Sequence, residues 1–90
     1  MTRAERTLRI VNQRGLHARA SRKLAELALT FQAAIRIRRE EDVADATSLM
    51  DLMMLGAGLG SEIEVTAEGG DAEAAVAAIA ALVEGKFGEE

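Results

Sequence analysis

The stretch SEIEVTAEGGDAEAAVAAIAALVEG, residues 61–85, places a strand pattern, a turn and a helix pattern in immediate succession. In its first part the apolar residues Ile63 and Val65 alternate with polar residues, which is the period of a half-buried strand. The letters GGD then predict a turn. A strand followed directly by a helix indicates a sheet that is covered by helices.

The helix pattern in this stretch runs to about Glu84, and Asp71 is a plausible N-cap for it. Gly85 stands where a left-handed C-terminal cap is expected. The residues predicted to face inward from this helix are Ala75, Val76, Ile79, Leu82 and Val83. This apolar stripe predicts that the helix packs on the sheet.

The segments that precede this stretch contain the remaining strands. RTLRIVN (residues 6–12) and AAIRIRR (residues 33–39) alternate polar and apolar side chains, and each predicts a strand. EEDVADA indicates a short edge strand around Val43. Arginines at positions 36 and 38 fall on the polar side of their strand, which predicts a solvated sheet face.

Two further helices are expected. Apolar residues recur every three to four positions from Ala18 to Leu29, as in an amphipathic helix. SLMDLMML, residues 48–55, predicts a short helix with Ser48 as its N-cap and with leucines 49, 52 and 55 facing inward. The order is therefore β-α-β-β-α-β-α, which predicts an α+β protein with helices on one face of a single sheet.

Composition narrows the class of protein. Ninety residues suffice for one domain with a small core. The absence of cysteine excludes disulfides and thiolate sites, and the two aromatic residues, Phe31 and Phe87, argue against base stacking on nucleic acid. No secretory signal or membrane-spanning run is visible, so we expect a cytoplasmic protein without membrane insertion.

The charge is distributed unevenly along the chain. Residues up to Arg39 include ten Lys/Arg and two acids, a formal charge of +8, whereas residues from Glu40 onward include one Lys and thirteen acids, a charge of −12. This asymmetry suggests a basic surface that attracts an acidic partner or an anion. Two solvated faces with incidental bias are the alternative.

GLHARAS, residues 15–21, holds His17, the only histidine of the chain. Residues 14–17 include no Ser, Thr, Asp or Asn, so the helix that begins at Ala18 lacks the usual side-chain cap. Its first N–H groups, those of Ala18 and Arg19, are then expected to be free to cradle an anion such as phosphate. The guanidinium of Arg19 can bind phosphate oxygens through two N–H bonds.

His17 at such a site suggests a phosphohistidine, because an unprotonated imidazole nitrogen is a nucleophile near neutral pH. The protein would then carry a phosphoryl group on one ring nitrogen without transforming a substrate. A surface histidine with no task is the alternative. Metal binding is poorly supported by one histidine without cysteine, so we expect no metal and no cofactor.

GLHARAS followed by KLAEL, and later SLMDLMMLGAGLGSEIEVTAEG, resemble the HPr family, the histidine-containing phosphocarriers of the bacterial phosphoenolpyruvate-dependent phosphotransferase system. The resemblance covers about Thr7 to Val83 and implies a single HPr-like domain over residues 1–90. It also implies the family's open-faced β-sandwich, a four-stranded antiparallel sheet with three helices on one face.

The resemblance also implies roles for individual residues. His17 resembles the histidine that enzyme I phosphorylates, and Arg19 resembles the arginine that steadies the phosphoryl group. Ser48 resembles the serine that an HPr kinase phosphorylates in many bacteria. The acceptors would be proteins of the IIA type, and the protein would act as a monomeric carrier, not an enzyme, in sugar transport.

A docking surface for these partners is expected from the two helices beside the site. Its members are Ala20, Arg22, Lys23, Met50, Asp51, Met53 and Met54. The three methionines cannot all be buried, and flexible thioethers suit a surface that accepts several partners. Basic residues here, with Arg14, would steer acidic partners to the site.

One departure from the family pattern is Ala20, because the family usually has proline at this position. Proline would pre-set the first turn of the helix, so the substitution bears on how the site is tuned. It hints at a divergent branch in which the carrier signals by phosphorylation-dependent docking and does not drive sugar uptake. A nucleic-acid binder is a third alternative, disfavoured by the acidic second half of the chain.

Overall fold

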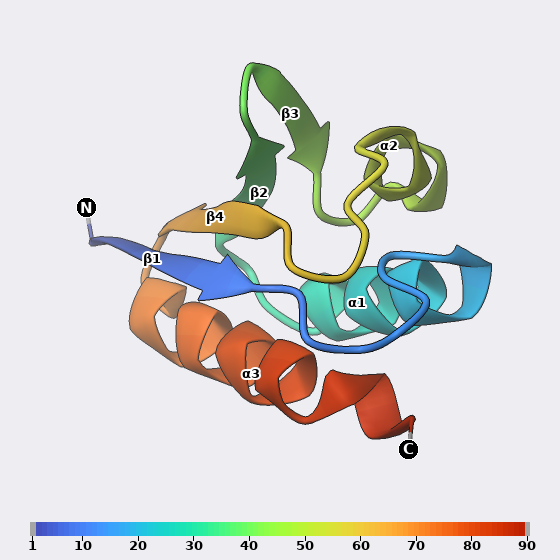
Figure 1. Ribbon diagram of the computed structural model, residues 1–90. Helices are drawn as coiled ribbons and strands as arrows, with labels where there is room; N and C mark the ends of the chain where they lie inside the picture. Colours follow the sequence, from blue (N-terminus) through green and yellow to red (C-terminus); the bar gives the residue numbers. More distant parts are fainter. Residues whose placement is uncertain (1, 90) are drawn as a thin grey trace.

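Strands and helices follow one another in the predicted order in the computed structural model, which describes residues 2–89 (Figure 1). The strands are β1 (Arg3–Arg9), β2 (Ala34–Arg39), β3 (Asp42–Asp45) and β4 (Glu62–Glu68). The helices are α1 (Ala18–Leu29), α2 (Leu49–Met54) and α3 (Ala72–Glu84), followed by the 3-10 turn η1 (Lys86–Gly88). Each strand and helix predicted from periodicity is therefore confirmed.

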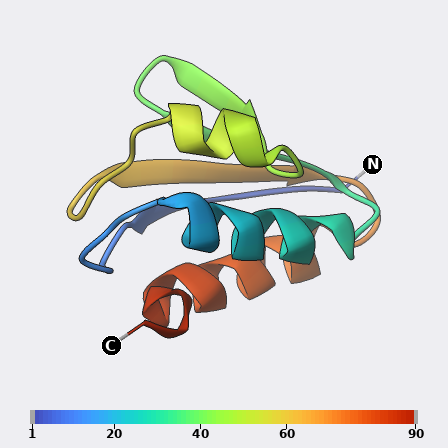
Figure 2. The same cartoon turned by 90° about the vertical axis from the view of Figure 1, so that its right-hand side faces the viewer.

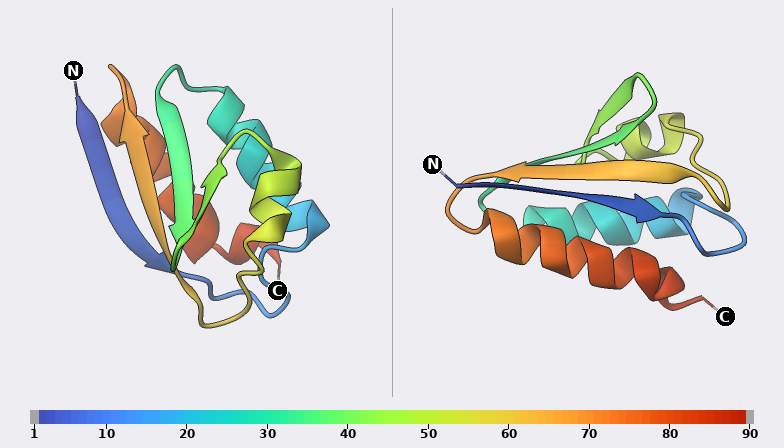
Figure 3. Two further views of the ribbon diagram at one scale, coloured as in Figure 1. Left: turned by 90° about the horizontal axis from the view of Figure 1, so that it is seen from above. Right: turned by 60° about the vertical axis from the view of Figure 1, so that its left-hand side comes forward.

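The four strands form one antiparallel sheet in the order β1-β4-β2-β3 (Figure 3, left). The register places Ile37 beside Val65 on one side and beside Ala44 on the other. These three side chains are fully buried, whereas Arg36 and Arg38 are exposed on the opposite face. The short β3 is an edge strand, and the other sheet face is solvated, as predicted.

Helices α1 and α3 lie side by side under one face of the sheet (Figures 2 and 3). The predicted inward stripe of α3 is buried except for Leu82, which is half-buried. Helix α2 packs against α1 and the edge strand β3 (Figure 1). The predicted open-faced α+β architecture is thus confirmed, and the packing brings α2 beside the first turns of α1.

Two predictions about these elements, the bounds of β1 and the inward orientation of Leu49, were wrong. Strand β1 spans Arg3–Arg9 and not residues 6–12. Ile10 still bonds to the start of β4, with its N–H 2.9 Å from the Ser61 carbonyl, but Asn12 turns into the interior. Leu49, predicted to face inward, is 39% exposed because it occupies the outer side of the first turn of α2.

Asp71 precedes α3 as predicted, yet its side chain makes no cap hydrogen bond. Its carboxylate instead accepts the backbone N–H groups of Gln32 and Ala33, each at 2.8 Å. The hydrogen bond from Gln32 has the larger effect, and together the two bonds lower the pKa of Asp71. The carboxylate therefore ties the loop before β2 to the start of α3, a long-range role that the local pattern concealed.

Gly85 is not the left-handed cap that the sequence suggested, because its φ is −84°. The left-handed conformation falls on the next two residues, Lys86 (φ 59°) and Phe87 (φ 56°). The chain reverses there and buries the Phe87 side chain in the core. As a result, residues 86–89 return toward the start of α1.

Candidate functional site

A glycine turn determines where α1 begins. Gly15 has φ +65°, and a Cβ on it would lie 2.4 Å from the carbonyl oxygen of Ala57. The next residue, Leu16, is buried and donates its N–H to that same oxygen at 2.9 Å. The close approach of these two loops therefore requires glycine and positions the residue that follows Leu16.

His17 is the N-cap of α1, and its own imidazole acts as the cap: Nδ1 accepts the N–H of Arg19 at 3.3 Å. The expectation that this N–H lacks a partner was therefore wrong, because a histidine in extended conformation can bring Nδ1 over the first turn. The His17 carbonyl accepts the N–H of Ser21 at 2.8 Å. The buried Ser21 hydroxyl donates to the Leu16 carbonyl at 3.0 Å and locks the turn.

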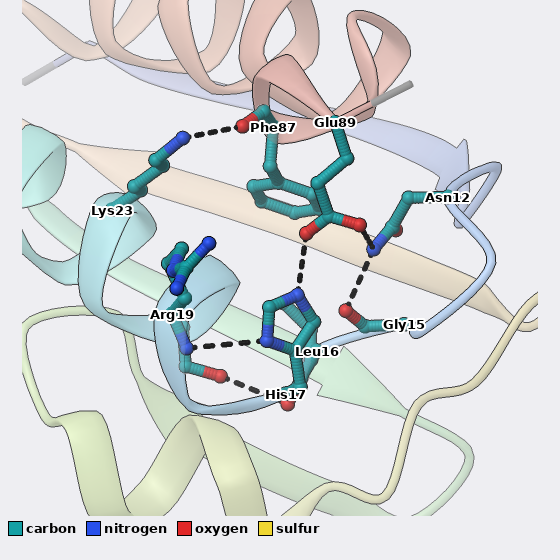
Figure 4. A network of polar contacts seen from close by, with 9 residues as sticks. Asn12, Gly15, Leu16, His17, Arg19, Lys23, Phe87 and Glu89 are labelled. Carbon is teal, nitrogen blue, oxygen red and sulfur yellow. Dashed lines mark hydrogen bonds and ion pairs between the residues drawn. The ribbon is translucent and has the colours of Figure 1, made fainter.

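The other ring nitrogen, Nε2 of His17, contacts the carboxylate of Glu89 (Figure 4). The Asn12 amide donates to the same carboxylate at 3.2 Å and to the Gly15 carbonyl at 2.9 Å. The hydrogen bond to His17, and next that to Asn12, lower the pKa of Glu89. The imidazole is held from both sides and is 18% exposed.

Sequence reasoning missed Asn12 and Glu89. Asn12 lies in the turn before Gly15, and its burial is the only feature that singles it out. Glu89 is 72 positions from His17 in the chain. No local pattern connects the two, and the contact depends on the chain reversal at Lys86 and Phe87.

The cationic side chains predicted around the site differ in whether they already have a hydrogen-bond or ion-pair partner. Arg19 is exposed, and its guanidinium has no hydrogen-bond or ion-pair partner within residues 2–89. Arg22 pairs with Glu26 at 3.1 Å on the surface of α1. The Lys23 ammonium donates to the Phe87 carbonyl at 2.7 Å (Figure 4). Of these three cations, Arg19 is therefore the one best placed to bind an external anion.

The residues predicted to form a docking surface on α1 and α2 are exposed, with one exception. Met50 and Met54 are 69% and 77% exposed, and Met53 and Asp51 are exposed as well. Ala20 is fully buried because it faces the core from α1, so its assignment to the docking surface was wrong. The remaining members lie on two adjacent helices, which allows one partner to contact both.

Ser48 caps α2 as predicted, and its hydroxyl accepts the N–H of Asp51 at 3.2 Å. The Asp51 carboxylate in turn accepts the N–H of Asp45 at 3.3 Å. Ser48 is half-buried. A phosphate on this hydroxyl would therefore meet a carboxylate one turn into the helix.

Two other functional features, a metal cluster and a membrane-spanning helix, are absent from residues 2–89. No group of three or more His, Asp or Glu side chains there is placed to hold a metal ion. None of the helices in this part of the chain is long and apolar enough to cross a membrane.

A histidine that caps a helix beside an exposed arginine is the central feature of this site. The family model described as PTS HPr component phosphorylation site matches residues 4–85. The chain belongs to the HPr family. This confirms the membership that the sequence predicted. Its relatives in the family include proteins named phosphocarrier protein NPr and phosphocarrier protein HPr.

Three HPr-family relatives illustrate the similarity. The chain is 49% identical to phosphocarrier protein NPr of Shewanella violacea, over 99% of this chain and 98% of the relative. It is 42% identical to phosphocarrier protein HPr of Cupriavidus necator, over 94% and 96% of the two chains. A crystal structure of HPr from Thermoanaerobacter tengcongensis superposes with a TM-score of 0.93 at 38% identity, over 97% and 98% of the two chains.

Proposed function

We propose that this phosphocarrier accepts a phosphoryl group from enzyme I on His17 and passes it to acceptor proteins of the IIA type. One observation carries the proposal: the His17 imidazole presents Nδ1 to the first turn of α1, with the exposed side chain of Arg19 two residues further on. Nucleophile, helix N-terminus and cation then act on the same phosphoryl group.

Transfer to this site needs little covalent chemistry from the protein. The Nδ1 lone pair of His17 forms the new N–P bond, and the bond from phosphorus to the donor's nitrogen breaks, leaving its electron pair on the donor. The Arg19 N–H that caps Nδ1 in the free protein then donates to a phosphoryl oxygen. Positioning and charge stabilisation supply most of the catalysis in such transfers.

The direct test incubates the protein with phosphoenolpyruvate and a cognate enzyme I. We expect phosphate that is labile in acid and stable in base, as for a phosphohistidine, and its transfer to an added IIA-type protein. Absence of such phosphate from the wild-type chain would refute the proposal.

A regulatory branch of the family is a second candidate function. NPr and HPr proteins both stand among the relatives, with NPr of Shewanella violacea at 49% and HPr of Cupriavidus necator at 42% identity. Ala20 in place of the family's usual proline supports divergence as well. A pull-down that compares the His17-phosphorylated protein with the unphosphorylated protein distinguishes the regulatory function from transport. A regulator retained by only one of the two forms indicates signalling, whereas retention of IIA-type proteins alone indicates transport.

Association with an acidic partner is expected to slow as salt rises. Arg14, Arg19 and Arg22 project from the surface around the site. Surface charges of this kind attract an oppositely charged partner and speed its association. Salt at 0.1–0.15 M screens this attraction beyond about 8–10 Å. Stopped-flow association with enzyme I between low and physiological salt checks this, and a rate independent of ionic strength would contradict steering.

Phosphorylation of Ser48 by an HPr kinase is expected to slow phosphorylation of His17. The added charge would lie beside Asp51, within the docking surface, where it would repel an acidic partner. We expect Ser48→Asp to lower the rate of His17 phosphorylation several-fold. Ser48→Ala is the control, because it costs about 1 kcal/mol of capping but adds no charge. Equal rates in the two variants would argue against regulation at Ser48.

A further inference from the structure

The segment after α3 folds back as a well-anchored arm over His17. Phe87 is buried to 1% exposure, and its carbonyl accepts the Lys23 ammonium at 2.7 Å. Gly88 follows with φ +77° and leads directly to Glu89. The Glu89 side chain thereby reaches the imidazole from the opposite side to α1 (Figure 4).

The contacts of the imidazole determine which nitrogen carries the proton. The N–H of Arg19 is a donor, so Nδ1 of His17 must present a lone pair to it. The ionised carboxylate of Glu89 is an acceptor only, so Nε2 must present a hydrogen to it. Both contacts favour the same neutral tautomer, with Nε2–H and an unprotonated Nδ1.

The carboxylate itself is held in place by a buried amide. Nδ2 of Asn12 donates to two acceptors, the Gly15 carbonyl and Oε1 of Glu89, so the orientation of the amide is determined by its partners. This leaves Oε2 of Glu89 for His17. The hydrogen bond with His17, and next that from Asn12, lower the pKa of Glu89, so the carboxylate is charged at neutral pH.

We propose that Glu89 is a positioning residue for phosphoryl transfer, holding Nε2–H of His17 so that Nδ1 is presented as the nucleophile. The inference rests on the proposed function. When the Nδ1 lone pair forms the N–P bond and the donor's N–P bond breaks, the proton stays on Nε2 and the ring becomes formally cationic. The Glu89 carboxylate offsets that charge, as a carboxylate beside histidine does in other transfer reactions.

The test replaces Glu89 by Gln and compares it with Glu73→Gln, which removes the same charge from the exposed first turn of α3. We expect Glu89→Gln to become phosphorylated about tenfold more slowly, the lower end of the loss seen when the carboxylate partner of a metal-bound histidine is removed. Glu73→Gln should react at the wild-type rate. In proton NMR the Nε2–H resonance of His17 should lie far downfield in the wild type and move upfield only in Glu89→Gln.

The outcomes separate this inference from the proposed function. An unchanged Nε2–H resonance and an unchanged rate in Glu89→Gln, with normal phosphate uptake by the wild type, would overturn the positioning role alone. A wild type that takes up no phosphate would overturn the proposed function, while the NMR comparison would still report on the hydrogen bond. An equal loss of rate in Glu73→Gln would show a charge effect and also overturn the role of Glu89.

Discussion

His17→Ala is expected to abolish phosphorylation of this protein by enzyme I. The substitution removes the only imidazole of the chain, and no cysteine is present to replace it as a nucleophile. The cradle formed by Arg19 and the start of α1 remains, but without Nδ1 no bond to phosphorus forms. The measurement is acid-labile phosphate after incubation with phosphoenolpyruvate and enzyme I, and its persistence in His17→Ala would refute the assignment.

The matched control for this prediction is His17→Asn. His17 caps α1 through its own side chain, so alanine also removes a cap, at a cost of about 0.5–2 kcal/mol. Asparagine is among the best N-cap residues and keeps the helix start, but its side chain is not a nucleophile. We expect no phosphate on either variant and a smaller loss of stability in His17→Asn. The asparagine variant thus separates loss of chemistry from loss of folding.

Gly15→Ala is expected to cause the largest loss of stability among single substitutions near the site. A left-handed backbone costs alanine about 1–2 kcal/mol. The new Cβ would also lie 2.4 Å from the carbonyl oxygen of Ala57 and 2.7 Å from Cα of Gly58, so the two loops must separate. That movement would disturb the Leu16 N–H bond to Ala57, on which the placement of His17 depends.

Gly56→Ala isolates the backbone part of this effect, so the difference between the two variants gives the steric part. Gly56 has nearly the same φ, +62°, but a Cβ there would meet no atom of residues 2–89 within 4 Å, apart from its chain neighbours. We expect Gly56→Ala to lower the free energy of unfolding by about 1 kcal/mol, and Gly15→Ala to lower it by more than about 2 kcal/mol. Urea unfolding of both variants measures the difference. Equal losses would show that the close approach to Ala57 costs nothing.

The fold was predictable from sequence where one periodicity ran unbroken. The bounds of α1 agree with the apolar spacing to the residue, and β2, β4 and α3 agree to within a residue or so. Their signal is local, because side chains two or three to four positions apart share a face. The same locality made His17 and Arg19 recognisable, since both lie at one helix start.

The predictions agreed less well with the structure where contacts with distant parts of the chain determined the partner of a side chain or the position of a turn. Asp71 binds the loop before β2 in place of its own helix, and the turn expected at Gly85 moved to Lys86 and Phe87. Burial of Phe87 in the core accompanies a left-handed conformation that local preference disfavours at a non-glycine residue. Tertiary packing decided these features against the local signal.

The amino-acid sequence by itself determined the element order, the solvated sheet face and the residue expected to carry the phosphoryl group. Each depends on neighbours in the chain, or on the one position where a nucleophile occurs. Only the tertiary structure decided that Glu89 contacts His17, that Asn12 binds Glu89, and that Ala20 is buried. The contact between His17 and Glu89 joins residues 72 positions apart through a chain reversal, and no local pattern encodes such a meeting.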